Sequence, residues 1–316
     1  MADVLFIKTS SLGDVIHHMP ALTEARAHRP DARFSWVVEE PFAPLVRLHP
    51  AVDRAIPVAG RQWRAAPHRA AAWRNLLELR RALRERPFEA VIDTQGLLFK
   101  SALLARFARG RRHGYDARSM KEWPASFLYD VRHRVERNRH AIARNRALTA
   151  QALGYAPAGP PDFGLDRAKL AGPASAPYGV LLHATARPEK QWPEDHWRLL
   201  TAALATDIDL VIPFGTVAER ARADRIASVA ARARVPGHAP LDAVARLVAG
   251  ASFVVGVDTG LLHLAAALGV PLVSIFAASE PGLTGPVGAG PIEVVGGRDT
   301  MPSAAEAMAA VGRVRS

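Results

Sequence analysis

The sequence contains no cysteine among its 316 residues. Disulfide bonds, thiolate nucleophiles and cysteine-ligated metals are therefore excluded. It also contains no apolar run near the roughly 20 residues that a membrane-spanning helix needs. The chain enters a predicted strand at residues 4–8 without the charged and apolar regions of a signal peptide. With 49% hydrophobic and 22% charged residues, it can bury substantial cores, as expected for a folded protein of the cytoplasm.

Lysine is scarce, and the positive charge is unevenly distributed. Only 5 of the 41 basic residues are lysine. Residues 1–160 hold 27 Lys and Arg against 15 Asp and Glu, a net charge of +12, whereas residues 161–316 hold 14 against 15. A surface rich in arginine explains the composition but not this asymmetry. The excess therefore indicates a polyanionic partner for the first half: nucleic acid, an anionic membrane or a phosphorylated substrate.

Short apolar strands alternate with helices along both halves of the sequence. The clearest unit is residues 253–271, where a strand buried on both faces leads through a tight turn into a helix and then into the next strand. In the first half, a helix is predicted over residues 15–28. Residues 60–72 lack a helical period and are predicted to be a partly mobile loop.

The alternation predicts the fold class. Repeated strand–helix–strand units favour parallel sheets with helices on both faces. Residues 157–177, rich in Ala, Gly and Pro, are the best linker candidate between two such runs. The sequence therefore predicts an α/β protein with two Rossmann-like, doubly wound domains facing a central cleft, residues 1–160 and residues 161–316.

The turn after the first strand, KTSSLGD at residues 8–14, is neither a P-loop nor a dinucleotide-binding fingerprint. It has a single glycine, which argues against a nicotinamide-dependent dehydrogenase. It places Asp14 at the start of a helix, and Gly13 lets a ligand approach the backbone closely. Ser11 and Asp14 also match a capping box, in which Asp14 only accepts from the N-cap amide. A ligand-facing carboxylate and a helix cap both remain open.

Three predicted strand ends in the second half also carry polar residues. Thr185 offers a hydroxyl and Lys190 a point charge to a phosphate. Glu219 suits the paired hydroxyls of a ribose, or it is a helix-start acid stabilised by the helix dipole. The turn at residues 258–260 presents backbone N–H groups to an anion. His263 faces either the same ligand or the core.

No metal-binding pattern stands out. The twelve histidines are scattered, and there is no HExxH motif. The one Asp-x-Asp triplet, residues 207–209, precedes a strand and is predicted to be a solvated turn at the end of the sheet away from the ligand. A metal-free site needs cations and helix N-termini to neutralise a diphosphate, and Lys190 and residues 258–260 are the candidates.

Five segments resemble the bacterial lipopolysaccharide heptosyltransferases, most closely those that add the first heptose of the inner core. They are KTSSLGDVIHHMPALTEA (8–25), WVVEEPFA (36–43), VIDTQGLLFKSAL (91–103), HATARPEKQWPEDHWRLL (183–200) and VVGVDTGLLHLAAALGVP (254–271). The resemblance spans nearly the whole length. Together the segments are highly specific, whereas the last one alone indicates only the wider family.

The resemblance implies a GT-B fold and a metal-independent, inverting transfer of heptose. The donor would be ADP-L-glycero-D-manno-heptose and the acceptor a Kdo hydroxyl of Kdo-lipid A, with no cofactor. Asp14 corresponds to the catalytic base, which deprotonates the acceptor hydroxyl. Donor-binding positions fall in the second domain, at Thr185, Lys190, Glu219, Asp258, Thr259, Gly260 and His263. Acceptor-binding positions fall in the first, at Ser11, Gly13, Arg61, Arg64, Lys121 and Arg144.

The sequence departs from the family pattern at three positions. Ala186 stands where a second threonine is common, which removes one hydroxyl donor to phosphate. Gln62 and Ala65 stand in the basic loop where more cations are usual. These departures affect the expected donor affinity and acceptor charge rather than the reaction.

Three other functions are consistent with parts of the sequence. A heptosyltransferase on the same scaffold that acts on a later core acceptor is the nearest. A basic nucleic-acid-binding protein would explain the charge, but the sequence lacks a recognisable reader module, so no nucleic-acid partner is expected. An inactive scaffold is disfavoured by the intact Asp14. The expected protein is a monomer in the cytoplasm, held peripherally at the cytoplasmic face of the inner membrane by its basic domain and the anionic inner leaflet.

Overall fold

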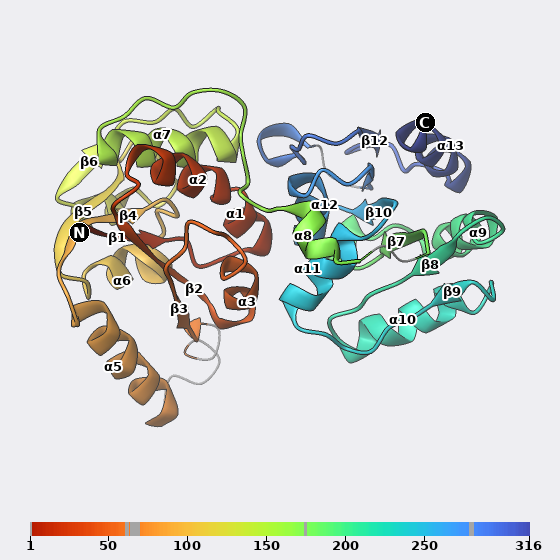
Figure 1. The fold of residues 1–316 in the computed structure, drawn as a ribbon, viewed down its shortest axis with the longest axis horizontal. Helices are drawn as coiled ribbons and strands as arrows, with labels where there is room; N and C mark the ends of the chain where they lie inside the picture. Colours follow the sequence, from red (N-terminus) through yellow and green to blue (C-terminus); the bar gives the residue numbers. More distant parts are fainter. Residues whose placement is uncertain (1, 61–62, 64–69, 174–175, 278–280) are drawn as a thin grey trace. The chain divides into compact units, whose positions relative to one another are not determined.

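The computed structural model describes residues 2–60, 63, 70–173, 176–277 and 281–316. It divides into two compact units, Met1–Gly164 (unit 1) and Leu165–Ser316 (unit 2). Each unit is built on a six-stranded sheet in which all strand pairs are parallel (Figure 1). The predicted class, two doubly wound α/β domains, is confirmed.

In unit 1 the strand order is β3-β2-β1-β4-β5-β6. The chain starts in the middle of the sheet, runs to one edge and returns to build the other side. The carboxyl ends of β1 and β4 therefore lie side by side at the point where the strand order reverses, where open α/β sheets bind ligands. The strands are β1 (Asp3–Ile7), β2 (Arg33–Glu39), β3 (Arg54–Val58), β4 (Phe88–Asp93), β5 (Gly110–Tyr115) and β6 (Val131–His133).

Helices cover both faces of this sheet (Figure 1). Helices α2 (Met19–His28) and α7 (Ala141–Leu153) pack together on one face. On the other face, Leu5 and Ile7 of β1 share a core with helices α5 (Ala70–Arg84) and α6 (Leu103–Ala105). The shorter elements are α1 (Leu12–Ile16), η1 (Glu40–Phe42), α3 (Ala43–Val46), the π-helical turn η2 (Leu98–Ala102) and η3 (Trp123–Leu128).

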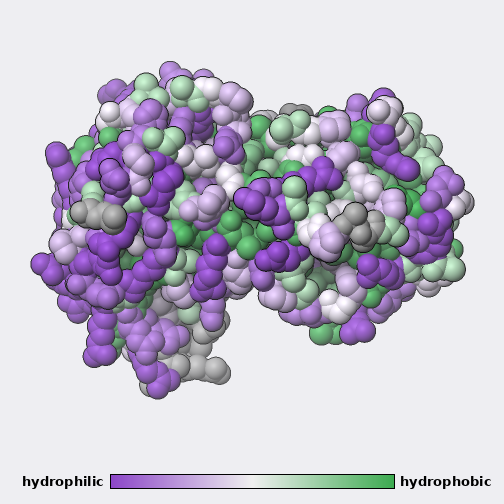
Figure 2. All heavy atoms as spheres, in the orientation of Figure 1, coloured by the Kyte–Doolittle hydropathy of each residue, from purple (hydrophilic) through white to green (hydrophobic). Residues whose placement is uncertain are grey.

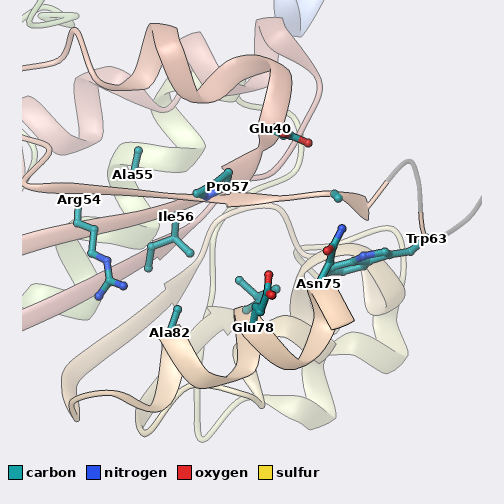
Figure 3. Close-up of a pocket in the computed structure, with 11 residues that line it drawn as sticks. Glu40, Arg54, Ala55, Ile56, Pro57, Trp63, Asn75, Glu78 and Ala82 are labelled. Atoms are coloured by element: carbon teal, nitrogen blue, oxygen red, sulfur yellow. The ribbon is translucent and has the colours of Figure 1, made fainter. Parts of the chain in front are cut away.

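Beyond the core, α5 and the edge strand β3 enclose a cavity of about 360 Å³ (Figure 3). Its lining mixes apolar residues, such as Ile56, with polar ones, such as Asn75 and Glu78. Because β3 pairs only with β2, this cavity lies at the sheet's edge rather than at the switch point.

Unit 2 repeats the same topology, with the order β12-β11-β10-β7-β8-β9. The carboxyl ends of β10, β7 and β8 are therefore neighbours, and the switch point lies between β10 and β7. The strands are β7 (Tyr178–Leu182), β8 (Asp209–Val211), β9 (Ala233–Arg234), β10 (Phe253–Val257), β11 (Leu272–Phe276) and β12 (Ile292–Gly296).

The helices of unit 2 also form two layers (Figure 1). One layer consists of α9 (Glu194–Leu204), α10 (Val217–Ala227) and α13 (Ala304–Arg315). These helices share with the sheet a hydrophobic core that contains Trp192 and Trp197. In the other, α12 (Gly260–Ala267) packs on β10 and β11, with α11 (Leu241–Ala249) and α8 (Arg167–Ala171) beside it. Two 3₁₀ turns complete the unit, η4 (Pro188–Lys190) and η5 (Gly282–Thr284).

Two local predictions in unit 1 were wrong. The single helix predicted over residues 15–28 is interrupted at His17 and His18, because Pro20 lacks the N–H that a continuous helix needs and instead sits in the first turn of α2. Of the loop predicted over residues 60–72, the last three residues begin α5, which starts at Ala70. Residues 61–62 and 64–69 lie outside the described ranges.

The structure also bears on membrane insertion and on the linker. Within the described ranges, every helix is too short or too polar to cross a bilayer. The predicted linker, residues 157–177, contains α8, and the two units divide between Gly164 and Leu165.

The stability of the protein is expected to fall as the pH drops, partly because of His49. This side chain is 1% exposed, and its Nδ1 accepts a hydrogen bond from Ala51 N at 3.2 Å, which requires the ring to be unprotonated at that nitrogen. Burial lowers the pKa of His49 from 6.5 to about 4. Below the unfolded value the unfolded chain binds the extra proton, so His49 should cost the fold about 3 kcal/mol between pH ~6.5 and ~4.

Urea unfolding of the wild type and of His49→Gln across that pH range checks the prediction. The variant should be less stable at neutral pH and show a shallower loss towards acid. Because the buried His18 and His183 also have lowered pKa values, the difference between the two profiles is the readout. Parallel profiles would contradict the assignment to His49.

Candidate active site

Asp14 lies in the turn after β1, at the carboxyl edge of the unit 1 sheet. Its Oδ2 accepts hydrogen bonds from Ser11 N at 2.7 Å and from Ser11 Oγ at 3.0 Å. These contacts are the capping box that the sequence allows. Among the described residues no donor reaches Oδ1 of Asp14. One carboxylate oxygen therefore fixes the turn and the other is available to a ligand.

A buried lysine lies at the start of this turn. Lys8, the residue after β1, is 6% exposed, and its Nζ donates to Thr94 O at 3.0 Å and to Asn145 Oδ1 at 3.5 Å. Burial lowers the pKa of Lys8, while the charges of Asp14 and Asp93 act in the opposite direction. Lys8 thus ties the β1 turn to the β4 turn and to α7 and lies within electrostatic range of Asp14.

The turn after β4 is built around the buried Asp93. Its Oδ1 accepts from Gln95 N at 2.8 Å and Gly96 N at 3.1 Å, and its Oδ2 accepts from Tyr129 Oη at 2.6 Å. Burial raises the pKa of Asp93, and the hydrogen bonds from Tyr129 and Ser101 oppose that shift. Gly96 has φ of +67°, a left-handed conformation that favours glycine. These hydrogen bonds fix the conformation of the β4 turn, which neighbours the β1 turn that carries Asp14.

Gln95 connects the two turns. Its Oε1 accepts from both Thr9 N, at 2.7 Å, and Thr9 Oγ1, at 2.8 Å. Gln95 and Lys8 are not among the site residues predicted from the sequence. The available signal was the segment DTQG at the end of a buried strand, which resembles the strand–turn pattern at Asp14.

Gln95→Ala is expected to lower kcat by about tenfold, since it removes the acceptor for two donors on Thr9 and loosens the turn that carries Asp14. Gln95→Glu keeps an oxygen for Thr9 and should retain more activity than the alanine variant. Steady-state kinetics and ADP titration separate the effects, because ADP affinity should stay unchanged in both variants. Equal wild-type kcat in both would contradict this positioning role.

The predicted acceptor-side cations differ in their surroundings, and two of them are not described by the structure. The Arg144 guanidinium lies 4.9 Å from the Tyr115 ring centroid and donates to Ser119 O. Its charge acts on Lys8 and Tyr115, as does that of Asp14, so Arg144 and Asp14 belong to one electrostatic cluster. Lys121 is exposed. Arg61 and Arg64, with the departures Gln62 and Ala65, lie outside the described residues.

In unit 2, the turns after β7 and β10 are joined by side chains. Thr185 Oγ1 donates to Asp258 O at 3.1 Å, and Lys190 Nζ forms an ion pair with Asp258 Oδ2. Both charged side chains are largely buried, at 20% and 18% exposed. The structure therefore brings together Thr185, Lys190 and Asp258, which are far apart in the sequence, at the switch point of the sheet.

The N-terminus of α12 opens at the same place. Thr259 is its N-cap residue in an extended conformation, but its side chain makes no capping hydrogen bond. The first N–H groups of a helix have no partner within it, and the helix dipole favours negative charge there. Gly260 is the first residue of α12. His263, one turn on, is 7% exposed, so most of its ring lies in the interior.

Glu219 sits beyond the end of β8, in a second capping box. Its Oε2 accepts from Gly215 N at 2.7 Å and Thr216 N at 3.1 Å, and Glu219 N donates to Thr216 Oγ1 at 3.2 Å. As with Asp14, no described residue donates to its second oxygen, Oε1. A third box, Ser303 with Glu306, caps α13 with the same geometry.

Two further expectations concern metals. No group of three or more His, Asp or Glu side chains within the described residues is arranged to hold a metal ion. Asp209 of the Asp-x-Asp triplet begins β8 and pairs with Arg232 at 2.8 Å. The triplet thus lies at the amino end of the strand, opposite the edge that carries Thr185 and Asp258, as predicted.

Comparisons with known proteins agree with this layout. The protein is 44% identical to lipopolysaccharide heptosyltransferase 1 of Escherichia coli K12 over 90% of this chain and 91% of that protein. It is 45% identical to the protein of the same name from Pseudomonas aeruginosa, over 90% and 81%. The structure of E. coli heptosyltransferase WaaC with ADP superposes with a TM-score of 0.92 at 40% identity, covering 98% of this chain and 99% of that one.

A more distant structure supports the fold assignment alone. The structure of E. coli ADP-heptose lps heptosyltransferase II superposes with a TM-score of 0.79 at 21% identity. The family model "Glycosyltransferase family 9 (heptosyltransferase)" matches residues 76–309, which include β4, β5 and β6 of unit 1 and all six strands of the unit 2 sheet. On this evidence the chain belongs to glycosyltransferase family 9, the heptosyltransferases, and has their two-domain GT-B fold.

Proposed function

We propose that this glycosyltransferase moves L-glycero-D-manno-heptose from ADP-heptose to a Kdo hydroxyl of Kdo-lipid A, with inversion and without a metal. Unit 1 takes the acceptor and unit 2 the donor. The single observation that carries the proposal is the geometry of Asp14, whose Oδ2 is held by Ser11 and whose Oδ1 is open at the ligand edge. Direct displacement needs one base of this kind.

The donor assignment is supported by the chemistry of the unit 2 edge. Lys190 and the N-terminus of α12 supply positive charge for a diphosphate. Thr185 and Thr259 supply hydroxyls, and the open oxygen of Glu219 suits ribose hydroxyls. The E. coli heptosyltransferase WaaC has been solved "with ADP" and "with ADP-2-deoxy-2-fluoro heptose". These ligands are the product and an analogue of the proposed donor.

In the proposed reaction, the acceptor oxygen forms a bond to the anomeric carbon while the bond from that carbon to the diphosphate oxygen breaks. Asp14 takes the hydroxyl proton, ADP leaves, and the configuration inverts. Lys190 and α12 stabilise the charge that develops on the leaving diphosphate. Lys8 lies within electrostatic range of Asp14 and ties its turn to the β4 turn through Thr94.

The acceptor is proposed to carry phosphates and carboxylates, which the basic excess of unit 1 would attract. Arg144, Lys121, Ser11 and Gly13 are the described positions proposed for it, and Arg61 and Arg64 are proposed from the sequence. The protein is further proposed to act as a monomer at the cytoplasmic face of the inner membrane. A later core acceptor remains the second candidate, since it needs the same base and donor.

ADP release from ADP-heptose, with Kdo-lipid A as acceptor and EDTA present, tests the proposal. Turnover that depends on the acceptor and survives EDTA is the expected result. Turnover only with an acceptor that already carries a heptose would favour the later-acceptor function. Loss of turnover in EDTA with recovery on adding a divalent metal would contradict metal independence, and a product with retained configuration would contradict inversion.

Glu219→Gln is expected to raise the KM for ADP-heptose by about tenfold, because a neutral amide binds ribose hydroxyls less strongly than a carboxylate. The KM for the acceptor should not change. Glu306→Gln is the matched control, since Glu306 forms the same capping box away from the proposed donor site. If the two variants behave alike, Glu219 is only a helix cap.

A further inference from the structure

Unit 1 holds several large apolar side chains out in solvent. Phe99 is 80% exposed, Phe127 64% and Trp123 56%. Together with the partly exposed Leu103 they form a surface that we call the aromatic ledge: Phe99, Leu103, Trp123 and Phe127. Phe99 and Leu103 come from the η2–α6 segment and the other two from η3, and η2 and η3 pack against each other. Residues distant in the sequence thus build one apolar surface.

Two contacts fix the segments that carry the ledge. Leu98 N donates to Glu122 Oε2 at 2.7 Å, which ties η2 to the start of η3. The Trp123 and Phe127 rings meet edge to face, with centroids 5.8 Å apart. Large apolar side chains that are fixed outward, rather than folded into the core, mark a surface that contacts something apolar.

The ledge lies beside the proposed acceptor site. It begins directly after the β4 turn, and Phe99 helps to line a cavity of about 610 Å³. Thr9, Leu97 and Leu104 line the same cavity. Thr9 belongs to the turn that carries Asp14 and is bound by Gln95. One cavity therefore connects the ledge to the edge of the sheet where the acceptor hydroxyl must be deprotonated.

Three basic side chains lie close to residues of the ledge. Lys100 follows Phe99, Lys121 precedes Trp123 by two residues, and both are exposed. The Arg132 guanidinium lies 5.5 Å from the Phe127 ring centroid. The nearby acid Glu122 accepts from the backbone of η2. Viewed from the side drawn in Figure 2, hydrophilic side chains dominate the surface of unit 1, as its basic composition requires.

Aromatic rings beside cations match one partner in particular. Trp and other aromatic side chains favour the boundary between lipid headgroups and acyl chains, and Lys and Arg favour anionic headgroups. We propose that the aromatic ledge docks unit 1 on an anionic bilayer, with Phe99, Trp123 and Phe127 entering the headgroup–acyl boundary. The inference deepens the proposed function and rests on it in one respect: an acceptor anchored by acyl chains must reach Asp14 while its chains stay in the bilayer.

Sedimentation with vesicles tests membrane docking by the ledge independently of glycosyl transfer. The probes are vesicles of phosphatidylcholine alone and of phosphatidylcholine mixed with phosphatidylglycerol. The wild type should bind the anionic vesicles preferentially and lose affinity at high salt. The triple variant Phe99→Ala/Trp123→Ala/Phe127→Ala should bind them at least about tenfold more weakly, since buried apolar area drives interfacial binding.

Two control variants sharpen the experiment. Leu199→Ala/Met308→Ala removes exposed apolar side chains from unit 2 and should leave vesicle binding unchanged. Trp73→Ala/Leu77→Ala removes those exposed on α5. If this α5 variant loses binding and the ledge variant does not, the docking surface is α5 and the proposal is overturned. Circular dichroism and thermal melting establish that each variant is folded.

Activity separates docking from catalysis. With a deacylated, water-soluble acceptor the double variant Trp123→Ala/Phe127→Ala, which leaves the cavity lining unchanged, should turn over like the wild type. With the acceptor in vesicles it should be slower by a similar factor to its loss of binding. A wild type inactive on both acceptors would overturn the proposed function but leave the vesicle result intact. Equal vesicle binding by the wild type and the ledge variant would overturn the ledge alone.

Discussion

Asp14→Asn is expected to lower turnover by about 10²- to 10⁴-fold, the usual contribution of a positioned general base. Asparagine has nearly the same shape and keeps an oxygen for Ser11, so the capping contacts at 2.7 and 3.0 Å can persist. What it loses is the ability to take a proton. The loss should therefore appear in kcat, while ADP affinity and thermal stability change little.

The chain supplies its own control for this experiment. Glu306→Gln makes the same carboxylate-to-amide change in a capping box with an equal N···O distance of 2.7 Å. It reports what weakening such a box does to stability and turnover when no acceptor is involved. If Asp14→Asn turned over as fast as Glu306→Gln, Asp14 would be a helix cap and another group would have to act as the base.

The three capping boxes show why sequence spacing left Asp14 undecided. Ser11–Asp14, Thr216–Glu219 and Ser303–Glu306 have the same pattern, and the structure forms all three. The structural and the functional interpretation of Asp14 turn out to be compatible, because capping uses Oδ2 and leaves Oδ1 open. Fixing one oxygen also orients the other, which is how a surface carboxylate can be held ready for a proton transfer.

The fold could be predicted because its signals are local. Buried apolar strands such as Phe253–Val257 and breaks such as Asp258–Gly260 are encoded by consecutive residues, and the strand, turn and helix predicted within residues 253–271 are all observed. Helix boundaries were less accurate, as at α1 and α2, where Pro20 decides the break. The strand order follows from topology rules that also place the predicted site turns at the carboxyl edges of the sheets.

The candidate site could be predicted only in part, because several of its contacts join residues far apart in the chain. The bond from Gln95 to Thr9 spans 86 positions, and that from Lys8 to Asn145 spans 137. Nothing in the composition of either segment specifies its partner. The Lys190–Asp258 ion pair is of the same kind: both residues were predicted to bind the donor, but not to bind each other.

Lys190→Ala is expected to weaken ADP binding by about 10- to 100-fold, since hydrogen bonds to charged groups contribute on the order of 1.5–3 kcal/mol. Two effects add in this variant. The diphosphate would lose a positive partner, and the largely buried Asp258 carboxylate would lose the lysine paired with it beside the proposed diphosphate site. Calorimetric titration with ADP measures the sum. Lys169→Ala, which removes an exposed lysine paired with Asp166, is the control and should bind ADP normally.

A double variant separates the two effects. If Lys190 acts only by neutralising Asp258, then Lys190→Ala/Asp258→Ala should recover most of the lost affinity, since the repelling carboxylate is gone. If Lys190 contacts the phosphates, as proposed here, the double variant should remain weak, because no cation replaces the lysine. Recovery to wild-type affinity would overturn the phosphate contact and leave Lys190 as the counter-ion of Asp258. A persistent deficit would require that the ion pair opens, at least in part, when ADP binds, with the ammonium shared between carboxylate and diphosphate.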